Sequence, residues 1–150
     1  MVSKSNINEF LSLKNLAVVG VSRNAKKFGN AVFKELKNKG FQVFPVNPYI
    51  TDYEGERCYP DLQSLSGKVE GAVLVVPPYV TEKTVEDAAF AGIKNIWIQQ
   101  GAESETALSF CSENNINVVY GECILMFAEP AAFFHRVHRF AYGVFGKLPV

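Results

Sequence analysis

The chain has 150 residues, and its 15 lysines and arginines balance its 15 aspartates and glutamates, so the formal net charge is zero. Apolar residues make up 48% and charged residues 20% of the sequence, a composition typical of globular proteins. This length suits a single domain over residues 1–150, and the composition argues against intrinsic disorder. Because the balanced charge provides no broad cationic face, we expect no nucleic-acid partner.

Neither membrane insertion nor secretion is indicated by the sequence. No segment approaches the roughly 18 consecutive apolar residues of a membrane-spanning helix, and the polar first ten residues lack the hydrophobic region of a signal peptide. The three cysteines, Cys58, Cys111 and Cys123, are an odd and sparse set without CxxC spacing. We therefore expect a reduced, cytoplasmic protein that does not associate with membranes.

Five short apolar runs rich in β-branched residues recur along the chain, at intervals close to the length of a strand–helix unit. Because they are apolar on both faces, they are typical of parallel strands covered by helices on two sides. The predicted strands comprise residues 16–21, 41–46, 72–76, 95–98 and 117–120.

Helix start and stop signals follow most of these strands. The predicted N-caps are Asn30, Thr81 and Ser104, and the first two helices should end near Gly40 and Gly92. The crossover after the second strand is turn-rich and offers only a short helix around residues 62–65. The alternation predicts an α/β fold: a doubly wound, Rossmann-like parallel sheet of about five strands in three layers.

Ligands of such sheets bind at the carboxyl ends of the strands. After the first strand, Gly20 allows close backbone approach, and the amides and helix N-terminus that follow favour an anion. Arg23, Lys26 and Lys27 add positive charge there. The spacing is not GxGxxG, since Ser22 occupies the second glycine position.

The other strand ends present further residues to the same edge of the sheet. Asn47 and Pro48 follow the second strand, where a nicotinamide-dinucleotide site usually places an acidic residue, so NAD is disfavoured. Pro77 and Pro78 stiffen the loop after the third strand. Gln100 stands beside a glycine turn after the fourth strand.

Five short motifs stand in order along the chain, most of them at strand ends: residues 20–22, 46–48, 55–62, 75–80 and 98–102. By these motifs the chain resembles the small CoA-binding Rossmann proteins over about residues 16–126. It is similar to the CoA-binding domain of the succinyl-CoA synthetase α subunit and of the NDP-forming acyl-CoA synthetases. The resemblance implies that the ligand and cofactor is CoA or an acyl-CoA.

The resemblance also implies which residues form the site. The loop after the first strand would hold the phosphates, with its cations near the 3′-phosphate or the pyrophosphate. The second strand end would border the adenosine, the third would line the path of the ligand, and the fourth would close the other side. The 3′-phosphate adds about −1.5 to −2 charge if it titrates like a phosphoserine, so its site requires cations and no carboxylate. The implied site consists of Gly20, Val21, Ser22, Arg23, Lys26, Lys27, Phe28, Asn47, Pro48, Val76, Pro77, Pro78, Gln100 and Gly101.

The ligase reaction is not carried over by this resemblance. The synthetases use a phosphorylatable histidine and a nucleotide-grasp domain, and these 150 residues offer space for neither. We therefore expect a binding protein rather than an enzyme. One alternative is a small nicotinamide-dependent oxidoreductase or redox sensor. A second alternative is an interaction subunit with a vestigial pocket.

Cys123 is the one catalytic candidate, because it follows the fifth strand beside the expected pocket. No histidine stands nearby in sequence to deprotonate it, and free cysteines are usually inert apolar groups. An amphipathic helix is predicted at residues 130–145, with an apolar face wide enough to pack on the domain or on a partner subunit in a homodimer. His135 and His138 in that helix have arginines as neighbours, so we expect no metal site.

Overall fold

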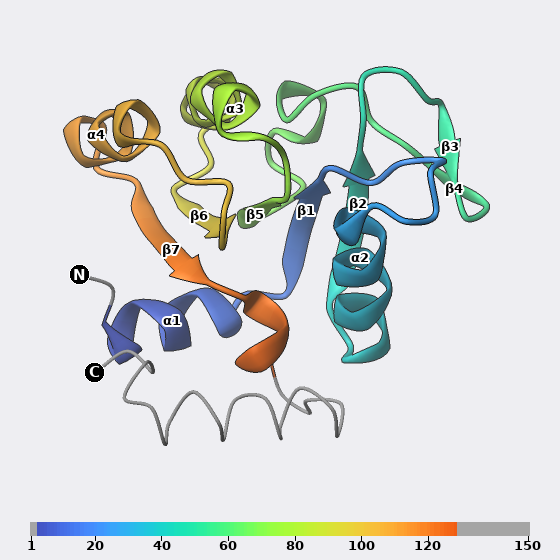
Figure 1. Ribbon diagram of the computed structural model, residues 1–150, viewed down its shortest axis with the longest axis horizontal. Coiled ribbons are helices and arrows are strands. Elements are labelled where there is room, and N and C mark those ends of the chain that lie inside the picture. The colour runs from blue at the N-terminus through green and yellow to red at the C-terminus, as the bar shows by residue number, and fades with distance from the viewer. Residues whose placement is uncertain (1–2, 129–150) are drawn as a thin grey trace.

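The computed structural model describes residues 3–128, and its core is a sheet of five parallel strands in the order β2-β1-β5-β6-β7 (Figure 1). The predicted fold class is confirmed: the sheet is doubly wound, with helices on both faces. The strands of this sheet are β1 (Asn15–Val19), β2 (Gln42–Val46), β5 (Gly71–Leu74), β6 (Asn95–Gln99) and β7 (Asn117–Glu122), and the helices are α1 (Lys4–Leu11), α2 (Phe28–Asn38), α3 (Pro78–Phe90) and α4 (Glu105–Glu113).

Several sequence predictions fall outside the described residues. The helix expected at residues 130–145 lies there, and so do the homodimer hypothesis built on it and both histidines, His135 and His138. Within residues 3–128, no helix combines the length and the apolar character that crossing a bilayer requires.

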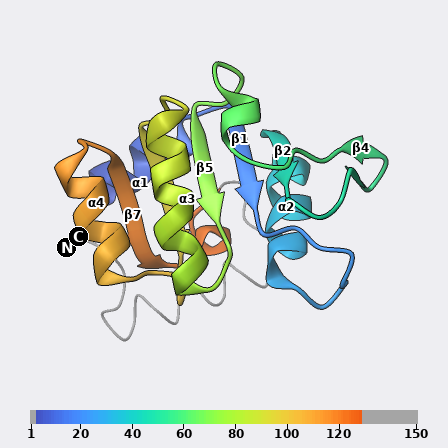
Figure 2. The ribbon, with the colours of Figure 1, turned by 90° about the horizontal axis from the view of Figure 1, so that it is seen from above.

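Successive residues of each strand point to opposite faces of the sheet and form two separate cores. Leu16 and Val18 of β1 belong to the core covered by α1 and α2, whereas Ala17 and Val19 belong to the core covered by α3 and α4. In Figure 2, α3 and α4 lie in front of the sheet and α1 lies behind it. Trp97 of β6 is fully buried in the first core. The helices therefore hold the sheet from both sides, as the apolar runs predicted.

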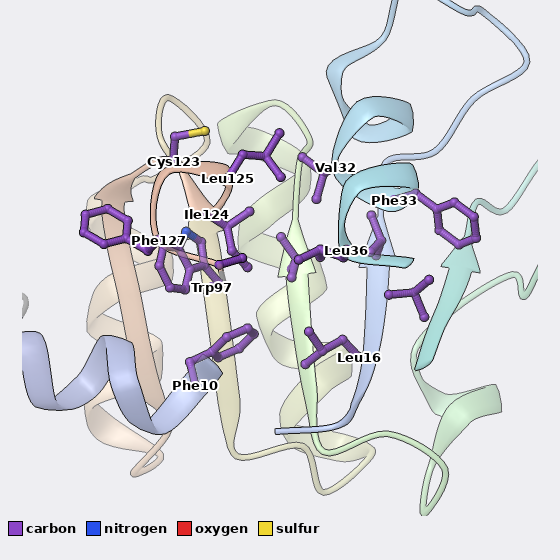
Figure 3. Close-up of a cluster of buried hydrophobic side chains, with 14 of the residues drawn as sticks. Phe10, Leu16, Val32, Phe33, Leu36, Trp97, Cys123, Ile124, Leu125 and Phe127 are labelled. Carbon is purple, nitrogen blue, oxygen red and sulfur yellow. The ribbon is translucent and has the colours of Figure 1, made fainter. Parts of the chain in front are cut away.

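The helix α1, which the sequence analysis did not predict, closes one end of the first core. Its N-cap is Ser3, whose hydroxyl oxygen accepts a hydrogen bond from the backbone of Asn6 at 3.2 Å. Phe10 of α1 meets the ring of Trp97 edge to face, with 5.5 Å between the ring centroids (Figure 3). The short 3-10 helix η2 (Ile124–Met126) adds Ile124 and Leu125 to the same cluster.

A single residue, Tyr59, extends the sheet beyond β2. Its backbone N–H donates to the carbonyl of Pro45 at 2.9 Å, and its own carbonyl accepts from Asn47 at 2.9 Å. With Tyr59 counted as a rudimentary strand, the strand order is the one that dinucleotide-binding sheets share, and the order reverses between β1 and β5. Pro45 tolerates this edge position, because the N–H that it lacks would point away from β1.

Two of the three predicted N-caps are wrong. Helix α2 begins at Phe28, so Asn30 lies inside its first turn, where its side chain bonds the preceding loop instead. Helix α3 begins at Pro78, and the buried Thr81 hydroxyl donates to the carbonyl of Pro77 at 3.4 Å. Ser104 caps α4 as predicted, with its hydroxyl oxygen accepting from the backbone N–H of Ala107 at 3.1 Å.

The crossover after β2 contains a hairpin that the sequence analysis treated only as turns. Strands β3 (Asp52–Tyr53) and β4 (Glu56–Arg57) are antiparallel, and the 3-10 helix η1 (Gln63–Leu65) occupies the place of the predicted short helix. Glu54 and Gly55 connect the strands with φ angles of 51° and 79°, a two-residue turn with positive φ at both positions. The Tyr53 ring anchors the hairpin on α2 by packing against Phe33 at 5.2 Å.

Candidate functional site at the carboxyl edge of the sheet

Two glycines allow close backbone approach at the end of β1: Gly20 toward the segment that follows β5, and Gly29 of α2 toward Gly20. A Cβ atom on Gly20 would lie 2.2 Å from the carbonyl oxygen of Val75, and one on Gly29 would lie 2.2 Å from the carbonyl oxygen of Gly20. Real Cβ atoms do not approach backbone this closely, so only glycine fits either position. Gly29 thus does the packing work of the last glycine in GxGxxG, at a longer spacing that a motif search does not find.

Asn30 fixes the loop between these glycines. Its side chain is buried, its Oδ1 accepts from the backbone N–H of Ser22 at 2.8 Å, and its Nδ2 donates to the carbonyls of Ser22 at 2.8 Å and Asn24 at 3.1 Å. The loop is therefore held from the first turn of α2. The backbone N–H of Ser22, one of the expected phosphate contacts, is already occupied.

Other donors at this end of α2 remain free. Among residues 3–128, the backbone N–H groups of Val21, Phe28 and Gly29 have no hydrogen-bond partner. Lys26 and Lys27 directly precede the helix, and neither forms an ion pair with a carboxylate of the described chain. A helix N-terminus with unpaired amides and adjacent lysines favours an anion.

This helix end opens onto a shallow hollow of about 410 Å³ beside β5 and β6. None of its lining residues in the described chain is acidic. The hollow brings together six of the predicted site residues, although they come from three different strand ends. These are Lys27, Phe28, Val76, Pro77, Gln100 and Gly101.

A larger groove of about 750 Å³ lies on the other side of the loop after β5, between the ends of β1 and β2 and the helix α3. Only Pro48 of the predicted residues lines it. Tyr49 and Tyr79 also line it, with 91% and 75% of their surfaces exposed. Both rings are therefore open to a ligand in this groove. Lys83 of α3 stands in the same wall.

A third hollow, of about 350 Å³, is lined by Arg23 but by neither Lys26 nor Lys27, with which Arg23 was grouped as a phosphate contact. Ser22 and Arg23 line this hollow together with residues of α2 and of the hairpin. The guanidinium of Arg23 lies 3.3 Å from the carboxylate of Asp52. The expectation that no carboxylate stands near the cations is therefore wrong for Arg23.

The remaining predicted residues have structural contacts or lie outside these hollows. The Asn47 side chain donates to the carbonyl of Val21 at 2.7 Å and accepts from the backbone of Tyr49 at 2.7 Å, which ties the end of β2 to the loop after β1. Cys123 follows β7 but is buried in the first core, with 8% of its surface exposed (Figure 3). Gly20, Val21, Lys26, Asn47 and Pro78 line none of the three hollows.

Comparison with known proteins agrees with this geometry. Residues 14–129 match the family described as CoA binding domain. The chain is 32% identical over 101 residues to the α subunit of the ADP-forming acetate–CoA ligase II of Pyrococcus furiosus, which covers 67% of this chain and 22% of that subunit. The chain spans between 14% and 22% of the length of the four acetate–CoA ligase chains that it matches.

Solved structures share the fold. A conserved hypothetical protein from Pyrococcus furiosus superposes with a TM-score of 0.71 at 40% identity, covering 74% of this chain and 96% of that one. The apo form of the dinucleotide-forming acetyl-coenzyme A synthetase 1 of Ca. Korarchaeum cryptofilum superposes with a TM-score of 0.63 at 27% identity, covering 71% of this chain and 25% of the synthetase.

Proposed function

The chain belongs to the family of CoA binding domains, and on this premise we propose that it binds CoA or an acyl-CoA across the carboxyl edge of its sheet, without ligase activity of its own. The observation that carries the proposal is the N-terminus of α2. There, the backbone N–H groups of Val21, Phe28 and Gly29 have no hydrogen-bond partner among residues 3–128. Lys26 and Lys27 stand beside them and form no ion pair within the same residues. This arrangement suits a pyrophosphate, which needs several donors and positive charge at one place.

The two hollows on either side of the loop after β5 then receive the two ends of the ligand. The groove of about 750 Å³ offers the flat faces of Tyr49, Tyr79 and Pro48 to the adenine. The hollow of about 410 Å³ offers Val76, Pro77 and the turn after β6 to the pantetheine arm. The pyrophosphate lies between them in this arrangement, at the point where the strand order reverses.

The test is calorimetric titration of the full chain with CoA, dephospho-CoA, NAD and NADP. We expect CoA to bind most tightly and dephospho-CoA less tightly. Tighter binding of NAD or NADP would favour the oxidoreductase or redox-sensor alternative. Absence of heat with all four nucleotides would contradict the proposal and favour an interaction subunit with a vestigial pocket.

The lysines provide the first mutational prediction. Lys26→Ala combined with Lys27→Ala should weaken CoA at least about tenfold, because hydrogen bonds to charged groups contribute about 1.5–3 kcal/mol and about 1.4 kcal/mol is a factor of ten. Dephospho-CoA should weaken by the same factor, since both ligands carry the pyrophosphate. Titration of both ligands into the double variant measures this.

A matched control removes two lysines from the opposite edge of the sheet. Lys14 and Lys94 are exposed and directly precede β1 and β6, so replacing both with alanine changes the net charge equally. This control should bind CoA as the wild type does. A comparable loss in the control would mean that the lysines act only through the overall charge.

A further inference from the structure

Three ion pairs join the hairpin β3–β4 to the loop after β1 and to α2. Arg23 pairs with Asp52 at 3.3 Å, Lys34 with Glu54 at 3.6 Å, and Lys37 with Glu56 at 2.7 Å. Only the first two pairs line the hollow of about 350 Å³ that also contains Ser22 and Asn30. The two cations of this hollow are thus held by carboxylates of the chain itself.

These two pairs are open to water and loosely constrained. The side chains of Arg23 and Asp52 are 68% and 65% exposed, and each pair has a single contact between one nitrogen and one oxygen. Exposed pairs with one contact are weak, because water screens them and their side chains keep much of their freedom. A phosphate with up to two negative charges is a stronger partner for the same cations.

The position of the hollow indicates which phosphate would enter it. In sheets of this order, the pyrophosphate lies at the N-terminus of the helix after the first strand, and the ribose lies at the end of the second strand, where an arginine accommodates an additional phosphate. Arg23 follows β1, and the hairpin follows β2. Resting on the proposed function, we propose that Arg23 and Lys34 receive the 3′-phosphate of CoA and that Asp52 and Glu54 compete with it for them.

The hairpin is anchored, so Asp52 and Glu54 continue to repel the phosphate after the ligand binds. Tyr53 lies between the two acidic residues in the sequence. It is buried, with 6% of its surface exposed, and its ring packs against Phe33 of α2. The carboxylates of Asp52 and Glu54 therefore stay near the hollow when their ion pairs break. Their repulsion of the phosphate lowers the affinity for CoA and leaves dephospho-CoA unaffected.

The experiment neutralises the competitors. Asp52→Asn and Glu54→Gln, singly and together, are titrated with CoA and with dephospho-CoA at low ionic strength. We expect each substitution to tighten CoA about two- to fivefold, the range that exposed charge pairs support, with dephospho-CoA unchanged. Added salt should shrink the gain, because it screens exposed charges.

Glu56→Gln is the matched control, since Glu56 lies on the same hairpin and pairs with Lys37, which does not line the hollow. It should leave the CoA affinity unchanged. A second variant, Arg23→Ala, should reduce the advantage of CoA over dephospho-CoA, because only Lys34 then remains for the 3′-phosphate.

Three outcomes would overturn the proposal: CoA binding no tighter than in Glu56→Gln, weaker CoA binding, or an equal gain for both ligands. Weaker binding would mean that Asp52 positions Arg23 for the phosphate. A wild-type chain that binds no CoA would refute the proposed function and this inference with it. A wild-type chain that binds CoA, with no gain in the variants, would refute only the competition.

Discussion

The loop after β1 and the hairpin β3–β4 both border the candidate site, but they are held by opposite means. The loop is fixed by buried contacts: the close packing of Gly20 and Gly29, and the hydrogen bonds of Asn30. The hairpin is held by exposed ion pairs and by one buried ring, Tyr53. Packing therefore makes the backbone of the loop rigid. The charges of the hairpin are exposed, so water and salt weaken their interactions.

The largest effect is expected from Gly29→Ala, which disrupts the close packing that fixes the loop after β1. The new Cβ would lie 2.2 Å from the carbonyl oxygen of Gly20, and relief requires a shift of the backbone. We expect a loss of about 3 kcal/mol or more in unfolding free energy, at the upper end of the cost of overpacking. Urea unfolding measures it.

Gly40→Ala is the control for this prediction. Gly40 has a φ angle of 99° but open space around the new Cβ, so only the left-handed conformation is penalised, at about 1–2 kcal/mol. Equal losses in the two variants would show that the close approach at Gly29 carries no special cost.

Asn30→Ala comes next, because it removes three hydrogen bonds that hold the loop. We expect a loss of about 2–3 kcal/mol, since unpaired buried donors and acceptors remain, together with weaker CoA binding. Asn30→Asp has the same shape and retains the acceptor for Ser22, but it turns a carboxylate oxygen toward the carbonyls of Ser22 and Asn24. Unfolding and titration of both variants should show equal harm, and a fully stable Asp variant would contradict the role of the Nδ2 donor.

The smallest effect is expected on the hairpin side, from Tyr53→Phe. Burial, and then the charge of Glu54, raise the pKa of Tyr53 above its usual value of 10.0. The unfolded tyrosine therefore ionises first, so the unfolding free energy is unaffected by this group below pH 10.0 and falls as the pH rises through the folded-state pKa. The variant should lack this part of the alkaline loss.

At neutral pH the same variant should be as stable as the wild type or up to about 1 kcal/mol more stable, because the buried Tyr53 hydroxyl has no hydrogen-bond partner in the described chain. Unfolding free energies between pH 7 and pH 11 measure both parts. A clear loss at pH 7 would mean that the hydroxyl has a stabilising partner.

The sheet could be predicted from the sequence because its strands are buried on both faces and read as continuous apolar runs. The caps were less predictable. Asn30 and Thr81 have the residue types of N-caps, but both lie inside their helices, where their side chains bond carbonyls that precede the helix. At α3 the better signal was proline at the first helical position, Pro78.

The candidate site could be predicted only as a set of strand ends. Parallel topology brings Lys27, Pro77 and Gln100 to one hollow, and the sequence shows which residues follow each strand. The ion pair of Arg23 could not be predicted, since its partner Asp52 lies 29 residues away in the chain. Gly29 was missed because its partner is a backbone carbonyl, which has no signature in the sequence.

Tyr59 and Pro45 also have a consequence for how copies of this chain meet. An uncovered β2 would offer an outer row of backbone groups to a strand from another molecule. Tyr59 occupies part of that row, Pro45 removes one donor, and Arg57 and Lys68 lie over the Tyr59 ring at 4.7 and 5.5 Å. Two like charges and a missing donor make this border a poor template for edge-to-edge aggregation.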